Sequence, residues 1–272
     1  MPPDKEGRQG DNPGGHHTND LAATKQLVAV DITPAATQST TGTARAYDGG
    51  QYDVLAEAIG LRYWESVSVC WAKEPGGPLH WHHLSVCQVS ALLAGEYTHQ
   101  GSPPPPIDMG VWCNVNPLYI PDSEWRSTRG KAKHVTRWAA MVADLDIAPG
   151  KCPDEPVAWA IIDSLSDVVG KCPAAVVHSG HGLHPYWRLE GVNIGEPDEP
   201  LGHCCRPRAE VHASAKRWAE LVARVARDHG AAGVDSGVSG DLARILRVPG
   251  TWNNKGVEPV PVRLVQVEGQ PR

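Results

Sequence analysis

The chain has 272 residues, 41% of them hydrophobic, and carries a formal net charge of −6 at pH 7. This length can bury a sizeable core in one large domain or two small ones, and the charge excludes a surface that is basic as a whole. No apolar run approaches the roughly 18 residues of a membrane span, and the N-terminus lacks a charged-then-apolar signal segment. We therefore predict a cytosolic protein that does not bind membranes.

The first part of the chain divides into an arm and a short folded segment. Residues 1–50 are rich in Gly, Pro, Thr and charge, so they bury too little apolar surface to order themselves, and we predict a disordered or loosely attached arm. Residues 51–101 are predicted to form an N-terminal subregion. Its expected elements are a helix over 54–59, strands over 66–72 and 79–86, and a short helix over 90–93. The proline run 103–106 is predicted to separate this subregion from a core over 105–268.

Strands and helices alternate along the core, which indicates an α/β (α+β) domain. Asp154 and Pro156 are typical of a helix start, and Gly170 of a helix end. A second helix is predicted by the apolar spacing from Val211 to Val225 and ends at Gly230. The expected strands cover residues 109–116, 141–147, 174–178, 183–189 and 260–267.

Two carboxylates stand in the apolar strand over 141–147. Successive side chains of a strand alternate between its faces, so Asp144 and Asp146 are expected on one face, about 6–7 Å apart. Burying them without a positive partner costs several kcal/mol. Carboxylate oxygens suit Mg²⁺ or Mn²⁺, so the pair predicts a divalent-metal site. An edge strand with two solvated Asp residues remains the alternative.

Two further segments follow in order. The first covers residues 174–189 and reads as an apolar strand, the turn Ser179-Gly180-His181-Gly182, and a second strand that carries His184. The two glycines allow a tight turn and a close approach of backbone N–H groups to an anion. The second spans residues 233–255. It supplies a third carboxylate and a run of phosphate-binding candidates: Asp235, Arg244, Arg247, Asn253 and Lys255.

These motifs, in this order, resemble the archaeo-eukaryotic primase superfamily, and more narrowly the primase-polymerases of bacteriophages and plasmids. The resemblance covers roughly residues 105–265 and implies a catalytic core with an RRM-like mixed sheet and flanking helices. It implies a DNA primase and polymerase that acts in DNA replication. Its expected partners are a single-stranded DNA template, a primer, deoxynucleotides or ribonucleotides, and a fused or separate helicase, in the cytoplasm of a bacterial host.

The resemblance also implies roles for single residues. Asp144, Asp146 and Asp235 would hold two divalent ions, with which such enzymes activate the primer 3′-hydroxyl and stabilise the pyrophosphate leaving group. His184 would bind the incoming nucleotide, with Ser179 donating to triphosphate oxygens. The remaining phosphate charge would be neutralised by Arg244, Arg247 and Lys255.

Two of these assignments have competitors in the sequence. Asp241 also precedes the Arg-Ile-Leu-Arg segment; we favour Asp235 because Val234-Asp235 matches the hydrophobic-Asp pattern of the family. His181 competes with His184, which we favour because it follows the turn on the second strand.

Local basic segments can offset the acidic total. Residues 125–137 contain five basic residues and no acid, and residues 206–255 carry nine Lys/Arg against five Asp/Glu, a local net of +4. Such segments can present a basic face to a phosphate backbone, although a solvated charged face is the alternative. The predicted DNA-binding residues are Arg126, Arg129, Lys131 and Lys133.

Cysteines and tryptophans carry weaker signals. The seven cysteines include no Cys-x-x-Cys pair, and free thiols in a reducing cytoplasm are favoured over a zinc element built from His203, Cys204 and Cys205 with Cys152 or Cys172. Trp81, Trp138 and Trp187 are candidates for base stacking, but core packing is favoured.

Two other functions compete with the polymerase. His80-Trp81-His82-His83, with Tyr97 nearby, has the His-hydrophobic-His pattern of rolling-circle replication nucleases. A DNA-binding replication initiator on a degenerate primase fold is the second. The intact carboxylates Asp144, Asp146 and Asp235 argue against it, because a decayed site would be free to lose them.

Overall fold

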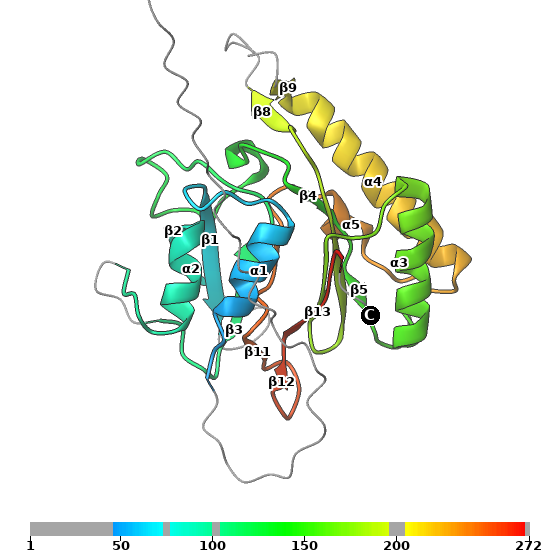
Figure 1. Cartoon of the computed structure of the whole chain (residues 1–272), viewed down its shortest axis with the longest axis horizontal. Helices are drawn as coiled ribbons and strands as arrows, with labels where there is room; N and C mark the ends of the chain where they lie inside the picture. The colour runs from blue at the N-terminus through cyan, green and yellow to red at the C-terminus, as the bar shows by residue number, and fades with distance from the viewer. Residues whose placement is uncertain (1–45, 73–76, 100–103, 196–204, 270–272) are drawn as a thin grey trace, which may run out of the picture. The chain divides into compact units, whose positions relative to one another are not determined.

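The computed structural model describes residues 46–72, 77–99, 104–195 and 205–269. They belong to one compact unit, residues 40–272 (Figure 1). The arm predicted over 1–50 lies outside the described residues up to residue 45. The last five residues of the predicted arm, 46–50, are described, and a helix begins at Gly50.

A first sheet joins the N-terminal elements to the core. It contains β1 (Ser66–Ala72), β2 (His80–Ser85), β3 (Gly110–Asn114) and β10 (Ile245–Arg247), in the order β10-β3-β1-β2, with every pair antiparallel. The boundary predicted between residues 51–101 and 105–268 therefore falls inside one sheet.

Two helices accompany this sheet, α1 (Gly50–Ala58) and α2 (Val86–Leu93). The structure starts both of them earlier than the sequence predicts. In α2 the reason is local, because the backbone N–H of Ser85 donates to the side chain of Gln88 at 3.0 Å in a capping box. This cap ends β2 at Ser85 and begins the helix at Val86.

A second sheet carries the motif strands. It contains β4 (Ala140–Val142), β5 (Leu145–Asp146), β6 (Ala175–His178), β7 (Gly182–Arg188) and β13 (Arg263–Val267). The order is β13-β6-β7-β4, with β5 also paired to β7, and all pairs are antiparallel.

The described residues also form two short ladders. Strand β11 (Trp252–Asn253) runs antiparallel to β12 (Val260–Pro261), and β8 (Asn193–Gly195) runs parallel to β9 (Cys205–Pro207). The strand predicted over 260–267 is thus divided at Val262 between two partners. The mixed α/β fold class is confirmed, with antiparallel pairing in both large sheets and parallel pairing in β8 and β9.

The remaining helices are α3 (Glu155–Val169), α4 (Arg208–Asp228), α5 (Ser236–Gly240) and the 3₁₀ turn η1 (Ala132–His134). Helix α3 confirms its sequence signals. Asp154 accepts a hydrogen bond from the Val157 N–H, and Gly170 ends the helix with φ 77°. None of the described helices is long and apolar enough to cross a membrane.

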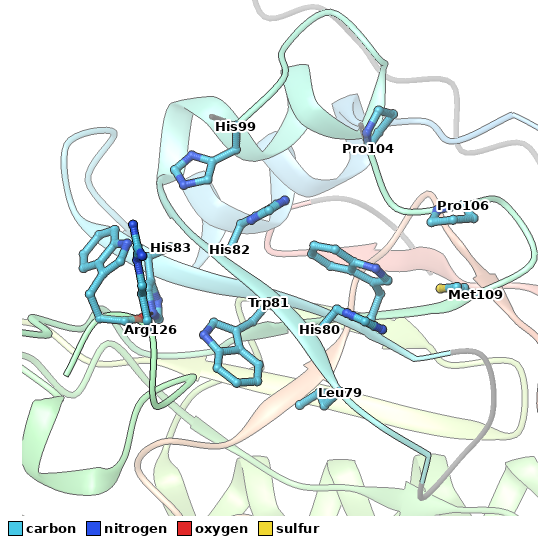
Figure 2. A pocket seen from close by; sticks show the side chains of 12 residues that line it. Leu79, His80, Trp81, His82, His83, His99, Pro104, Pro106, Met109 and Arg126 are labelled. Atoms are coloured by element: carbon cyan, nitrogen blue, oxygen red, sulfur yellow. Dashed lines mark hydrogen bonds between the residues drawn. The ribbon is translucent and has the colours of Figure 1, made fainter. Parts of the chain in front are cut away.

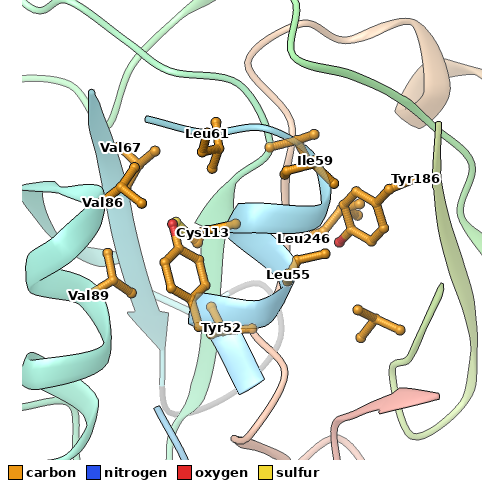
Figure 3. Packing of buried hydrophobic residues seen from close by; sticks show 14 of the residues in the cluster. Tyr52, Leu55, Ile59, Leu61, Val67, Val86, Val89, Cys113, Tyr186 and Leu246 are labelled. Atoms are coloured by element: carbon orange, nitrogen blue, oxygen red, sulfur yellow. The ribbon is translucent and has the colours of Figure 1, made fainter. Parts of the chain in front are cut away.

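The second sheet is buried on both faces. Alternate residues of β6 and β7 enter two different clusters: Ala175, Val177 and Tyr186 pack toward the first sheet and α1, as Figure 3 shows around Tyr186. Val176, Leu183 and Trp187 instead pack with apolar residues of α3 and α4. These motif strands therefore form a central layer of the described unit (Figure 1).

The strand that carries the two predicted carboxylates is interrupted between β4 and β5. Val142 pairs with Tyr186 and Leu145 with Leu183, so the register is unbroken and Ala143 stands opposite Pro185. The Ala143 N–H donates to Pro185 O at 3.4 Å, but Pro185 has no N–H to return. The missing bond explains why the ladder opens beside Asp144.

Candidate active site

Seven of the predicted site residues line one pocket of about 200 Å³. They come from three segments far apart in the sequence. Strand β5 and its junction with β4 bring the carboxylates, and the turn before β7 brings Ser179 while β7 itself brings His184. The cations come from the segment that runs from Arg244, just before β10, to Lys255, just after β11. The seven are Asp144, Asp146, Ser179, His184, Arg244, Arg247 and Lys255.

Asp144 and His184 face each other across the β5–β7 ladder. In the register that joins Val142 to Tyr186 and Leu145 to Leu183, Asp144 stands opposite His184. Nε2 of His184 lies 3.2 Å from Oδ1 of Asp144, at ion-pair distance, and Nδ1 of His184 is buried without a hydrogen-bond partner among the described residues. The histidine is therefore held by the carboxylate and keeps one ring nitrogen free.

The charges of the pocket act on Asp144. Burial raises the pKa of its carboxyl group, but the electrostatic and hydrogen-bonding effects of His184, followed by the charges of Arg244 and Lys151, outweigh burial and hold the pKa below its ordinary value. Asp144 is therefore ionised at neutral pH.

Asp146 is paired with a lysine that the sequence reasoning missed. Nζ of Lys151 lies 2.6 Å from Oδ2 of Asp146. This hydrogen bond raises the pKa of Lys151, and the charges of Asp144 and Asp235 act in the same direction. The only local signal for the contact is the Pro149-Gly150 pair, which predicts a turn that brings the chain back toward Asp146.

The glycine turn packs against the C-terminal loop. Gly180 has φ 92°, and a Cβ there would lie 3.1 Å from Cβ of Asn253. The Asn253 side chain donates to Ser179 O at 2.7 Å, and the Ser179 hydroxyl donates to Gly182 O at 3.2 Å. Ser179 thus lies in the pocket as predicted, while its hydroxyl is engaged within the turn.

Two arginines point unpaired nitrogens into buried space. Among the described residues, Nε of Arg244 and Nη1 of Arg247 have no hydrogen-bond partner. The guanidinium of Arg247 stacks on Trp112, 4.6 Å from the ring centroid, because the two residues are paired between β10 and β3. Burial lowers the pKa of Arg247 to about 10.

Three other residues of the pocket lining differ in how the sequence treated them. The sequence offered His181 as a competitor of His184 and Asn253 as a phosphate-binding candidate, and it gave no indication of Trp112. His181 and Asn253 line the pocket with the seven, and so does Trp112. Sequence reasoning had no signal for Trp112, because its place in the pocket depends on the pairing of β3 with β10.

The two candidates for a third carboxylate lie outside the pocket lining. Asp235 caps α5 and accepts from the Gly237 N–H at 2.8 Å. Asp241 accepts from the Ala243 N–H at 3.0 Å. Asp235 is still near enough for its charge to act on Lys151. Its role as a metal ligand stays a prediction.

The donor set can be compared with the metal that the motifs imply. Among the described residues, no group of three or more His, Cys, Asp or Glu side chains is arranged to hold a metal ion. Asp144 and Asp146 supply two carboxylates in one pocket, and Mg²⁺ is commonly bound through one or two carboxylates together with water and substrate phosphates. The pair therefore has the donor chemistry of a divalent-ion site, and a bound ion stays a prediction.

The basic loop uses part of its charge internally. Lys133 pairs with Glu124, and Arg129 donates to Ala243 O at 3.2 Å. Arg126 and Lys131 are exposed. Lys133 is exposed too, but its ammonium group is paired with Glu124, so Arg126 and Lys131 are the exposed members of the predicted four that no ion pair among the described residues engages.

The histidines of β2 line a separate cavity of about 720 Å³ (Figure 2). The ring centroid of His82 lies 4.8 Å from that of His99 and 4.8 Å from that of Trp71. Tyr97, the nucleophile of the nuclease alternative, is outside the cavity lining and its hydroxyl lies 3.3 Å from Nδ1 of His99. Burial, followed by the charges of His99 and His83, lowers the pKa of His82 to about 4.

The weaker sequence candidates have the following positions. Trp187 and Trp138 are buried in core clusters, as favoured, and Trp81 lines the cavity beside β2. His203 and Cys204 of the zinc alternative lie outside the described residues. Cys152 is completely buried and Cys172 is exposed, each as a free thiol.

Comparison with known proteins gives weak matches at the level of fold. No protein-family model matches the sequence, and no curated protein does. The structure is similar to the primase RepB′, with a TM-score of 0.43, 14% identity, and coverage of 82% of this chain and 57% of that chain. The catalytic domain of RepB′ in complex with initiator DNA has a TM-score of 0.43, 13% identity, and coverage of 82% and 87%.

A third similar structure is the AEP domain of the cyanophage S-2L primase-polymerase. It has a TM-score of 0.46 and 15% identity, and the match covers 83% of this chain and 93% of that chain. These structural neighbours are primases. The chain spans 57% of the length of RepB′.

Proposed function

We propose that the chain is a primase-polymerase that carries out template-directed nucleotidyl transfer in phage or plasmid DNA replication. The observation that carries this proposal is the convergence of three motifs, separated by up to about 110 residues, on one pocket. The pocket lining combines two carboxylates with three cationic side chains, and a metal-bound nucleoside triphosphate requires both kinds of charge.

In this proposal the carboxylates of the pocket bind the metal and its cationic side chains bind the phosphates. A divalent ion held by Asp144 and Asp146, with Asp235 as the candidate third ligand, would supply Lewis-acid activation of the 3′-hydroxyl and stabilisation of the leaving pyrophosphate. Arg244 and Arg247 offer unpaired guanidinium nitrogens to phosphate oxygens, and Lys255 adds an exposed positive charge.

His184 and Asn253 position the nucleotide. The contact with Asp144 holds the His184 ring, so its free Nδ1 has a defined direction. Asn253 ties the loop that carries Lys255 to the glycine turn. Single-stranded DNA is the proposed template, with the exposed Arg126 and Lys131 as its phosphate contacts.

The test is nucleotide incorporation on a primed and an unprimed single-stranded template with Mg²⁺ or Mn²⁺. Asp144→Asn and Asp146→Asn are each expected to lower incorporation by about 100-fold or more, because each removes a charge from the reacting centre. Asp167→Asn, an exposed carboxylate of α3, is the matched control and should leave the rate unchanged.

Other products would identify the competing functions. Cleavage of DNA with a covalent adduct lost in Tyr97→Phe would favour the nuclease. DNA binding with neither product would favour the initiator. Either result would refute the polymerase proposal.

A further inference from the structure

Lys151 lies among the carboxylates of the candidate active site. Its Nζ is 2.6 Å from Oδ2 of Asp146, and the side chains of the pair are 38% and 31% exposed. The negative charges of Asp144 and Asp235 also act on it. A single ammonium group thus interacts with all three carboxylates that the motifs single out.

A short closed loop holds Lys151 beside Asp146. The Cys152 N–H donates to Asp146 O at 3.1 Å, and the Ala148 N–H donates to Cys152 O at 3.1 Å. The Lys151 N–H donates to Ala148 O at 2.9 Å, and Cys152 is completely buried. The loop begins at the carboxylate residue itself, so the backbone positions the ammonium group relative to Asp146.

The same loop touches the segment that leads to Asp235. A Cβ on Gly233 would lie 1.9 Å from Gly150 O, so only glycine allows this approach. Lys151 is therefore placed between the β5 carboxylate and the segment carrying the candidate third ligand. This contact explains how Asp235, which is distant in the sequence, acts on Lys151.

The counter-charges of the two pocket carboxylates differ. The largest effects on Asp144 besides burial come from His184 and Arg244, with a smaller one from Lys151, whereas Asp146 is directly hydrogen-bonded to Lys151. A divalent ion coordinated by Asp146 has to compete with that ammonium group for the carboxylate. The ammonium group of Lys151 and a divalent ion on the same carboxylate would also repel each other.

We propose that Lys151 is the resident counter-cation of the active site, which neutralises Asp146 in the unloaded protein and leaves it when a divalent ion binds. This inference rests on the proposed function. Lys151 is a positioning residue: it keeps the carboxylates together without metal, and it sets how tightly metal is held.

The measurement is Mn²⁺ affinity of the full chain, by electron paramagnetic resonance of free Mn²⁺, together with the melting temperature without metal. Lys151→Met is expected to bind Mn²⁺ at least about threefold more tightly, the upper part of the range for a partly exposed ion pair. Without metal it should melt at a lower temperature, because Asp146 loses its partner, and Mn²⁺ should raise its melting temperature more than that of the wild type.

Three variants make the comparison specific. Lys151→Arg keeps the charge and should retain wild-type affinity. Lys171→Met removes an exposed lysine that donates to Arg188 O outside the site, and should not change affinity. Asp146→Asn combined with Lys151→Met should lose the tight binding, because the ligand is gone.

Other outcomes would overturn the inference. Unchanged or weaker Mn²⁺ binding in Lys151→Met would refute the role of Lys151. If Mn²⁺ affinity is unchanged and only nucleotide affinity falls, Lys151 is instead a phosphate ligand. Incorporation by the wild type with unchanged Mn²⁺ affinity in Lys151→Met refutes the role of Lys151 alone. If Lys151→Met binds Mn²⁺ more tightly but the wild type does not incorporate nucleotides, the polymerase proposal alone is refuted. If neither protein binds Mn²⁺, both the role of Lys151 and the metal site of the polymerase are refuted.

Discussion

Arg247 connects the core of the protein to its candidate active site. Its guanidinium is buried, stacks on Trp112, and keeps Nη1 without a hydrogen-bond partner among the described residues. A buried charge without a full set of partners is costly, and burial accordingly lowers the pKa of Arg247 to about 10. The group still carries its charge at neutral pH, so it is prepared to receive an anion such as a phosphate.

The first prediction concerns this guanidinium. Lys at position 247 keeps a charge but cannot form the planar stack on Trp112 or a two-pronged contact with phosphate. We expect Arg247→Lys to raise the KM for the nucleotide by about tenfold, the effect of losing one charge-assisted hydrogen bond. Steady-state incorporation kinetics measure this, and an unchanged KM would contradict a phosphate contact.

At the scale of elements, the site depends on how closely β5 approaches β7. Gly182 is the register partner of Asp146. A Cβ at Gly182 would lie 2.4 Å from Leu145 O and 2.8 Å from Cα of Asp146. Both contacts are to backbone atoms, so no side-chain movement can relieve them. The absence of a side chain at position 182 thus determines where Asp146 stands.

The second prediction follows from this contact. Gly182→Ala should push β5 away from β7, lower stability by about 1–3 kcal/mol as in other overpacked sites, and reduce incorporation by about tenfold or more. Urea unfolding and the incorporation assay measure the two effects. Gly50→Ala is a control, because its Cβ would meet only the flexible Asp48 side chain at 3.3 Å. Full activity in Gly182→Ala would show that Asp146 tolerates the shift.

At the scale of the whole molecule, β2 makes the stability of the fold sensitive to pH. His83 is buried, with Nδ1 2.7 Å from the Ser68 hydroxyl and Nε2 3.0 Å from Trp125 O, so it links the first sheet to the basic loop. Burial lowers the pKa of His83, and burial with neighbouring histidines lowers that of His82 to about 4. Both rings are neutral in the folded protein at neutral pH.

The third prediction is a loss of stability in mild acid. Unfolded histidine has a pKa of about 6.5, so between about pH 6.5 and 4 the unfolded chain binds more protons than the folded one. The contribution of these two neutral rings to the free energy of unfolding is fully present above about pH 6.5 and is lost as the pH falls toward 4. The melting temperature should therefore decrease over this range. His82→Phe, which keeps an aromatic ring against Trp71, should make the decrease shallower, and an identical pH profile would exclude His82 as a source.

Local signals were sufficient for the elements whose limits depend on neighbouring residues. Asp154, Pro156 and Gly170 predicted α3 because caps act within one turn, and β1 has the bounds expected from its apolar run. The order of the motifs also predicted which residue types would meet, and seven of the predicted residues share one pocket. These are properties of short segments and of their sequence in the chain.

What only the tertiary structure decided depends on residues distant in sequence. Pro185 opens the ladder beside Asp144 because the two strands are paired, and Trp112 reaches the pocket because β3 pairs with β10. The side chain of Asp235 is committed to capping α5, while Lys151 holds Asp146. The sequence by itself therefore predicted seven of the residues that line the site, but neither Trp112 nor Lys151. Strand register and close backbone contact, which no local pattern encodes, decided which charges face one another within it.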